Sequence, residues 1–172
     1  MIAVDSNIFV YAHREDSPWH PAADRVLTGL AESGAQWAVP WPCVHEFLAI
    51  TTHPRIFNPP TPISRAIEAL EAWFESPSVH LIGEAPGYWE ELKSVMRSGH
   101  ISGGAAHDAR IYAICRLHGV RELWSADRDF TRFKGIRVVN PLIARDSPGS
   151  SACYHTSGSA AFYSMLSRIE ER

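Results

Sequence analysis

Short apolar runs alternate along the chain with longer segments whose apolar residues recur every three to four positions. The runs cover residues 2–4, 37–39, 79–82, 122–124 and 137–139 and predict buried strands. Turn-forming residues follow several of them: Asp5-Ser6-Asn7 after the first run, Ser125 to Asp129 after the fourth, and Asn140-Pro141 after the last. The five runs are therefore predicted to form one sheet.

Helical spacing of apolar residues fills the intervals between these runs. The first predicted helix begins at Ser17-Pro18 and continues to Gly34, because a capping residue followed by proline is typical of a helix start. The second begins at Pro42 and reaches Thr51. A third helix is predicted to begin at Thr61-Pro62. A fourth is predicted over about 88–99 and a fifth over about 106–118. Strands that alternate with helices predict an α/β fold with a mostly parallel sheet.

The composition suits one globular domain followed by a different C-terminal segment. The chain has 172 residues, of which 45% are hydrophobic and 20% charged. Residues 1–145 are predicted to form the domain. Residues 146–172 are predicted to be a Ser/Gly-rich linker and a short amphipathic helix in which Phe162, Met165, Leu166 and Ile169 share one face.

Charge, hydropathy and cysteine content exclude several classes of protein. A formal charge of -3 argues against a broad basic surface for nucleic acid, so any such contact is expected to be local. The sequence contains neither a signal peptide nor an apolar run of membrane-spanning length, which predicts a cytoplasmic protein without a membrane anchor. Cys43, Cys115 and Cys153 form no CxxC pair, so neither a zinc knuckle nor a disulfide scaffold is expected.

Acidic residues follow two of the predicted strands and lie on two of the predicted helices. Asp5 and Asp127 each come just after a strand, where the carboxyl ends of parallel strands line a ligand crevice. Glu46 lies within a helix, Asp108 near the start of another, and Asp129 is a fifth candidate. Any one of these acids alone is more often a turn former or a helix cap. If they converge, they predict a magnesium or manganese site suited to phosphodiester hydrolysis.

Four motifs in order resemble the PIN-domain family, and the VapC toxins within it. They are Ile2-Ala3-Val4-Asp5-Ser6-Asn7, Pro42-Cys43-Val44-His45-Glu46-Phe47, His107-Asp108-Ala109-Arg110, and Leu123-Trp124-Ser125-Ala126-Asp127-Arg128-Asp129-Phe130. The resemblance covers residues 1 to about 143. It implies a three-layer α/β/α sandwich, usually dimeric, that binds Mg²⁺ or Mn²⁺ and cleaves structured or single-stranded RNA, commonly tRNA or rRNA.

The resemblance also assigns roles by matching position. It makes Asp5, Glu46, Asp108 and Asp127 the catalytic acids, with Asp5, Asp108, Asp127 and Asp129 as metal ligands. Asn7 and Ser125 match polar positions that orient the acids. The implied protein is the toxin of a type II toxin–antitoxin pair, held by a VapB-type antitoxin. The C-terminal segment resembles the inhibitory helix of such antitoxins, which predicts that it docks on the domain or on a dimer mate.

Other interpretations stay open beside this one. A non-catalytic PIN-like module that binds RNA or protein is one alternative. A metal-dependent phosphatase is another, although such enzymes normally carry a second acid where Asn7 stands. Arg14, Arg110 and Arg128 lie near the motifs and are candidates for holding RNA phosphates, while each is individually typical of an ordinary surface charge.

Overall fold

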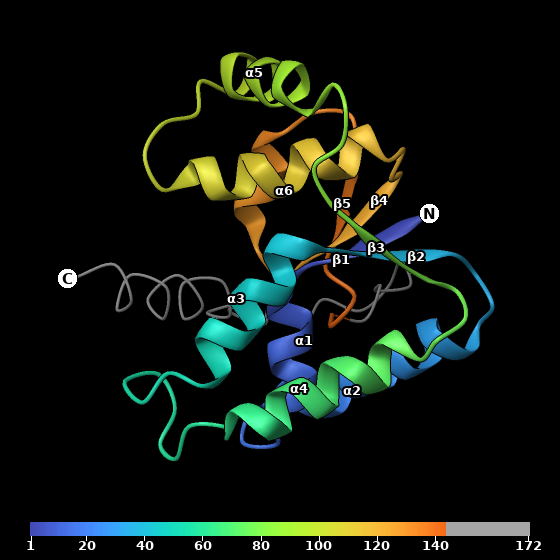
Figure 1. Cartoon of the computed structure of the whole chain (residues 1–172), viewed down its shortest axis with the longest axis vertical. Helices are drawn as coiled ribbons and strands as arrows, with labels where there is room; N and C mark the ends of the chain where they lie inside the picture. The colour runs from blue at the N-terminus through green and yellow to red at the C-terminus, as the bar shows by residue number, and fades with distance from the viewer. Residues whose placement is uncertain (144–172) are drawn as a thin grey trace, which may run out of the picture.

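In the computed structural model, which describes residues 1–143, five parallel strands form a single sheet with helices on both faces (Figure 1). The strands are β1 (Ile2–Val4), β2 (Trp37–Pro40), β3 (Val79–Ile82), β4 (Glu122–Trp124) and β5 (Arg137–Val139). Their order across the sheet is β3-β2-β1-β4-β5, and each neighbouring pair is parallel. The predicted α/β class and parallel sheet are confirmed.

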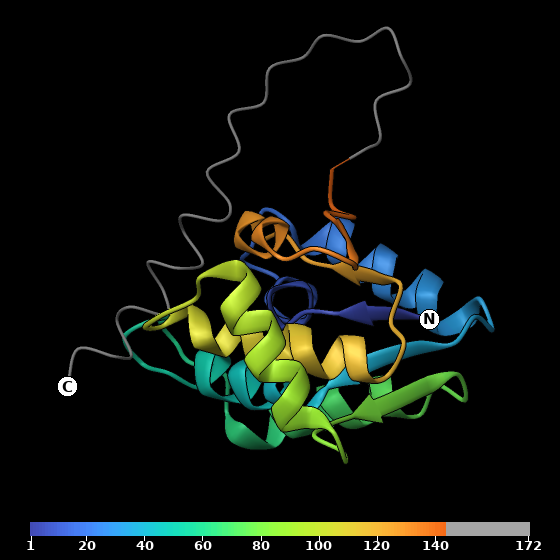
Figure 2. The same cartoon turned by 90° about the horizontal axis from the view of Figure 1, so that it is seen from above.

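Six α-helices and a short 3₁₀-helix connect the strands within the described residues. They are α1 (Ser6–His13), α2 (His20–Glu32), α3 (Trp41–Thr51), α4 (Ile63–Phe74), α5 (Tyr88–Gly99), α6 (Ala105–Leu117) and the 3₁₀-helix η1 (Arg128–Arg132). Figure 1 shows α5 and α6 on one side of the strands and α1, α2 and α4 on the other. Figure 2, seen from above, has α5 and α6 in front of the strands. This arrangement is the predicted three-layer α/β/α sandwich.

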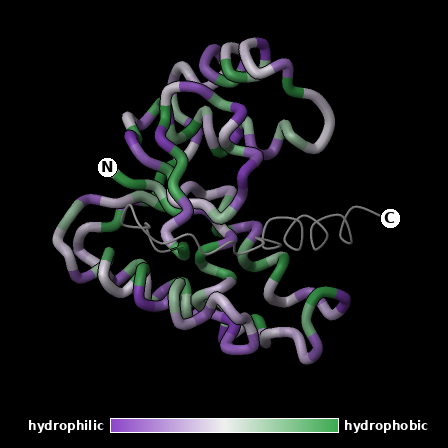
Figure 3. The backbone as a smooth tube through the Cα atoms, turned by 180° about the vertical axis from the view of Figure 1, so that it is seen from behind, coloured by the Kyte–Doolittle hydropathy of each residue, from purple (hydrophilic) through white to green (hydrophobic). Residues whose placement is uncertain are grey.

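Two hydrophobic cores form because successive strand residues point to opposite faces of the sheet. Val4 and Val39 pack with α1 to α4, whereas Ala3 and Ala38 pack with α5 and α6. In Figure 3 the hydrophobic colour concentrates near the strands, and the outer helices alternate between polar and apolar residues. Burial of both sheet faces is what makes the strands nearly continuous apolar runs in the sequence.

The helix α1 was missed by the sequence prediction, which treated Asp5-Ser6-Asn7 as a turn. Asp5 is instead the N-cap of α1, and its side chain accepts a hydrogen bond from the backbone N–H of Ser6. Residues 6–12 are all buried, so the helix has no polar face. A helix buried on all sides lacks the amphipathic period by which the other helices were recognised.

Two helices begin later in the structure than the sequence predicts. The first amphipathic helix begins at His20 rather than at Ser17-Pro18, because the Ser17 hydroxyl accepts from the N–H of Trp19 and stabilises a turn there. Thr61 does not cap α4, because the N-cap of that helix is Pro62. The Thr61 N–H donates to the carbonyl of Thr51, and its hydroxyl accepts from Arg14. The other predicted helices and the strands agree with the structure within one residue.

Tyr112 on α6 holds the segment that leads into β5. Its hydroxyl accepts a hydrogen bond of 2.8 Å from the buried N–H of Ile136, and its ring stacks on Phe133 at a centroid distance of 4.7 Å. We expect Tyr112→Phe to lower the free energy of unfolding by about 1–2 kcal/mol, because a buried N–H loses its acceptor while the ring packing stays. Urea denaturation measures the loss, and a value equal to that of wild type would contradict it.

Three further sequence predictions concern membrane spans, cysteines and the C-terminal segment. No helix within residues 1–143 is long and apolar enough to cross a membrane. Cys43 and Cys115 are both free and buried. The predicted domain end at residue 145, the linker and amphipathic helix of 146–172, and Cys153 lie outside the described residues.

Candidate active site

The candidate site lies where the order of the sheet reverses. From β1 the chain moves through β2 to β3 on one side, and then returns to place β4 and β5 on the other side. Loops that leave neighbouring strands at such a point diverge and leave a crevice at the carboxyl ends. Asp5 follows β1 directly, and Ser125 and Asp127 follow β4. These residues are therefore brought together by topology although they are about 120 positions apart.

Asp5 is at the centre of a buried hydrogen-bond network. Only 3% of its surface is exposed. Its Oδ1 accepts from the Ser6 N–H at 2.7 Å, and its Oδ2 accepts from Asn7 Nδ2 at 2.5 Å and from the Ser125 hydroxyl at 2.6 Å. The Cys43 thiol adds a weak donor to Oδ1 at 3.7 Å. Both carboxylate oxygens are thus fixed in orientation.

Asn7 and Ser125 join the ends of β1 and β4. Asn7 Nδ2 also donates to the Ser125 hydroxyl at 3.0 Å, and its Oδ1 accepts from the N–H of Ala126 at 3.1 Å. The Ser125 hydroxyl in turn accepts from the N–H of Asp127 at 2.9 Å. The amide of Asn7 therefore serves both strands at once, a task that the carboxylate found at this place in phosphatases could not perform as a donor.

Glu46 reaches the same network from the middle of α3. Its Oε2 accepts a 2.7 Å hydrogen bond from the hydroxyl of Ser6, whose N–H already binds Asp5. Ser6 is fully buried and links Asp5 to Glu46. Sequence reasoning missed Ser6 as a site residue, because nothing in its spacing relative to Glu46, forty positions away, signals the contact.

The other three acids differ in how they are held. Asp127 is 6% exposed and caps η1, with its Oδ1 accepting from the N–H of Asp129 at 2.7 Å. Asp108 lies in the first turn of α6, whose N-cap is Gly104, so it is not the cap of that helix. The carboxylate of Asp129 forms an ion pair with Arg132 at 2.7 Å. Its backbone, rather than its side chain, thus contacts the site.

Burial and like charges make the ionised acids unfavourable here. Desolvation first, and then the charges of Glu46 and Asp127, raise the pKa of Asp5 from 3.8 to about 8, against the opposing bonds from Ser125 and Ser6. Desolvation likewise raises the pKa of Glu46 from 4.5 to about 7, with repulsion from Asp108 adding to it. Asp5 and Asp127 also raise the pKa of Tyr11, after desolvation, to about 12. A chain of acid–acid repulsion therefore runs from Asp127 through Asp5 and Glu46 to Asp108.

The carboxylate oxygens of these acids are ligands of the kind that hard divalent cations prefer. Carboxylates that repel each other in a buried crevice are relieved when a cation neutralises them, and oxygen donors match magnesium or manganese. Within residues 1–143, however, no three His, Cys, Asp or Glu side chains already converge as a preformed ligand cluster. Asp5 is fixed by its donors, so the more exposed Asp108 is the side chain that would turn toward a cation.

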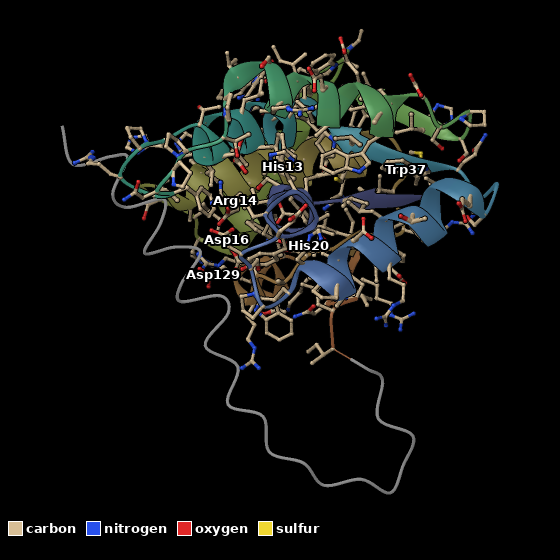
Figure 4. The ribbon with its side chains drawn as sticks, turned by 90° about the horizontal axis from the view of Figure 1, so that it is seen from below. His13, Arg14, Asp16, His20, Trp37 and Asp129 are labelled. Carbon is tan, nitrogen blue, oxygen red and sulfur yellow. The ribbon has the colours of Figure 1, made fainter. Side chains whose placement is uncertain are left out.

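The predicted RNA-binding arginines lie in three different environments. The guanidinium of Arg14 pairs with Asp16 at 2.6 Å and lies over the Phe57 ring, which leaves 13% of its side chain exposed, and Figure 4 shows Arg14 and Asp16 side by side. Arg110 is half exposed and pairs with Glu84 at 2.9 Å. Arg128 is exposed beside Asp127. Arg128 is the most exposed of the three, and the contacts of Arg14 are typical of a structural role.

Ser6→Ala tests the link between the two acids without any substrate. The Ser6 hydroxyl stabilises ionised Glu46, so its removal should raise the pKa of Glu46 above its value of about 7. We expect a rise of up to about one unit, since a hydrogen bond to a charged group contributes about 1.5 kcal/mol and one unit corresponds to 1.36 kcal/mol. Carbon-13 NMR titration of the glutamate carboxyls in chelator measures it. The exposed Ser94→Ala is the control, and an unshifted Glu46 would show that the bond does not form.

Sequence comparisons identify a family profile and several relatives that match most of the chain. A family profile described as the PIN domain matches residues 2–136. Ribonuclease VapC48 of Mycobacterium tuberculosis is 33% identical over 139 residues, which are 80% of this chain and 95% of the relative. The VapC ribonuclease Mb2897 of Mycobacterium bovis is 29% identical over 142 residues, which are 83% and 96% of the two chains.

Solved structures share the fold at low sequence identity. The VapC20 toxin of Mycobacterium tuberculosis, described as cleaving the sarcin-ricin loop, matches with a TM-score of 0.57 and 17% identity over 80% of this chain and 99% of its own. VapBC2 of Rickettsia felis, bound to a promoter DNA fragment, matches with a TM-score of 0.57 and 16% identity over 81% and 98%. These likenesses show a shared fold.

Proposed function

This chain belongs to the PIN domain family, and we propose that it acts as a VapC-type endoribonuclease, the toxin of a type II toxin–antitoxin pair. The observation that carries the proposal is the buried Asp5, fixed by three strong donors at the switch point of the sheet and flanked by Glu46 and Asp127. The chain that holds this site is 33% identical to a protein named as a ribonuclease. We propose structured or single-stranded RNA, such as tRNA or rRNA, as the substrate.

We further propose Mg²⁺ or Mn²⁺ as the cofactor, held by Asp5, Asp108 and Asp127. When bound, such an ion supplies an activated water and neutralises charge on the phosphate. Glu46 is the proposed general base, because burial brings its pKa to about 7, close to the pH at which a base works best. Ser6 holds Oε2 of Glu46, which leaves Oε1 as the atom that takes the proton of the attacking water.

The remaining polar residues position the acids. Asn7 and Ser125 fix the two oxygens of Asp5 in direction, so the carboxylate does not need to reorganise during the reaction. Asp129 supports Asp127 through its backbone N–H, and we assign it this positioning role in place of the metal ligation implied by the resemblance. Its carboxylate is engaged by Arg132.

Sequencing of RNA 5′ ends after induced expression tests the function. Wild type should create new 5′ ends at a small set of positions, whereas Asp5→Asn should leave the profile of uninduced cells. Identical profiles for the two proteins would refute the nuclease proposal and favour a non-catalytic module. A p-nitrophenyl phosphate assay tests the phosphatase alternative, and we expect no turnover.

We also propose a VapB-type antitoxin as the partner, and a homodimer as the functional form. Support comes from the structural neighbours, which include VapBC2 bound to promoter DNA and FitAB bound to a DNA fragment, the latter with a TM-score of 0.62 at 16% identity over 85% of this chain and 99% of its own. Light scattering of the purified chain measures its mass, and a monomer at micromolar concentration would contradict the homodimer.

A further inference from the structure

A pocket of about 220 Å³ lies between α3 and α6, directly beside the acids. Its lining residues are Pro42, His45, Glu46, Ala49, His107 and Arg110. Glu46 belongs to both the pocket and the acidic centre, because its carboxylate is bound to Ser6 and repelled by Asp108. Any group that occupies this pocket therefore lies next to the bond that the acids would cut.

Two exposed histidines contribute aromatic rings to the lining of the pocket. His45 is on α3, one residue before Glu46, and His107 is on α6, one residue before Asp108. Trp41 supports the ring of His45 at a centroid distance of 6.2 Å and an angle of 35°. Trp41 itself is 43% exposed and packs against the backbone of Gly83, since a Cβ added there would lie 3.3 Å from its ring. The orientation of His45 is thus partly fixed in advance.

The charges in the pocket do not suit a phosphate. Glu46 and Asp108 repel an anion, and the guanidinium of Arg110 is already paired with Glu84 at 2.9 Å. Pro42 and Ala49 add apolar surface to the lining. The volume is below the range of about 300–1,000 Å³ found for pockets that hold drug-sized ligands. These properties fit one flat, uncharged ring.

We propose that this pocket binds an unstacked base of the RNA substrate, adjacent to the cleaved bond, and that His45 and His107 set the nucleotide preference there. The proposal rests on the proposed ribonuclease function. Proteins that recognise single-stranded RNA stack its bases on aromatic side chains, histidine included, and read their edges with polar groups. The imidazole nitrogens supply those polar groups at the same rings.

Binding of short RNAs tests the proposal. The probes are fluorescein-labelled 12-mers of A, C, G and U, measured by fluorescence anisotropy with Asp5→Asn as the non-cleaving parent. His45→Ala and His107→Ala, added singly, should each weaken binding about tenfold and reduce the difference between the four probes. His107→Phe keeps a flat ring but not the nitrogens, so it should restore affinity while changing the order of preference. The exposed His80→Ala on β3 is the matched control and should bind like the parent.

Cleavage by the otherwise wild-type enzyme supplies the second readout. In the 5′ ends of digested total RNA, His107→Ala should flatten the nucleotide preference at one position beside the cut. Unchanged affinity and unchanged preference in both histidine variants would overturn the subsite. A Trp41→Ala variant with altered mass in light scattering and unaltered RNA affinity would also overturn it, by showing that this face binds a second copy of the chain. If wild type cuts no RNA but the histidine variants still weaken probe binding, the ribonuclease proposal fails, and base binding in the pocket is supported without a cleaved bond beside it.

Discussion

Replacement of Asp5 by Asn should lower the rate of RNA cleavage by on the order of a thousandfold or more. The side chain would lose one acceptor oxygen in a position where Ser6, Asn7 and Ser125 all donate. Its new NH₂ group would face donors rather than acceptors, and its negative charge, which attracts a cation, would be gone. Initial rates on total RNA, with the 5′ ends mapped, measure the loss.

The Asp5→Asn variant should nevertheless fold. The pKa of Asp5 is raised to about 8 in the folded protein, against 3.8 in an unfolded chain, so the native state binds more protons between these values. Stability contributed by this group is therefore present at low pH and falls as the pH rises toward 8. Asn carries no charge at any pH. In chelator at pH 8 to 9 the variant should melt at or above the temperature of wild type, and its stability should depend less on pH.

Asp24→Asn is the matched control for this experiment. Asp24 is exposed on α2, away from the crevice, and the substitution is chemically the same. The control should retain wild-type cleavage and the wild-type pH dependence of melting. Cleavage by Asp5→Asn within tenfold of this control would show that Asp5 is not at the reacting centre.

The positions of the strands could be predicted from the sequence because helices bury both faces of the sheet. A strand such as β1 then consists of apolar residues alone and ends abruptly at Asp5. The same burial hid α1, since a helix buried on all sides shows no apolar stripe. Hydrophobic patterning detects a helix by the difference between its buried face and its exposed face, and α1 has no exposed face over residues 6–12.

The candidate site was predictable in so far as it depends on strand ends. Asp5, Asn7 and Ser125 meet because β1 and β4 are neighbours. The family resemblance implied that these residues share a site, but the sequence did not show which strands are adjacent. The roles of Ser6 and Asp129 were not predictable, because they depend on side-chain packing. Ser6 reaches Glu46 only once α3 packs on α1, and the carboxylate of Asp129 turns to Arg132 one helical turn later. Sequence position placed Asp129 near the site, but it did not show whether the backbone or the side chain of Asp129 contacts the other acids.

Saturating Mn²⁺ should separate Asp108→Asn from wild type in thermal stability. Asp108 is half-buried in the first turn of α6, where it repels Glu46. In chelator, loss of this repulsion opposes loss of a favourable charge near a helix N-terminus, so the two proteins should differ by no more than about 1 kcal/mol. Wild type should gain about 2.7 kcal/mol when Mn²⁺ is a hundredfold above its dissociation constant, and the variant should gain less because one ligand is missing.

Melting curves in chelator and in Mn²⁺, for wild type, Asp108→Asn and Asp24→Asn, give the comparison. Asp24→Asn should gain as much as wild type, because that exposed residue lies on α2 and far from the acids in sequence and fold. An equal gain in Asp108→Asn would remove Asp108 from the cation site. Since Gly104 rather than Asp108 caps α6, a loss of stability in chelator beyond about 1 kcal/mol cannot be assigned to a lost cap. The difference between the two buffers, rather than either melting temperature alone, therefore measures what Asp108 contributes to holding a cation.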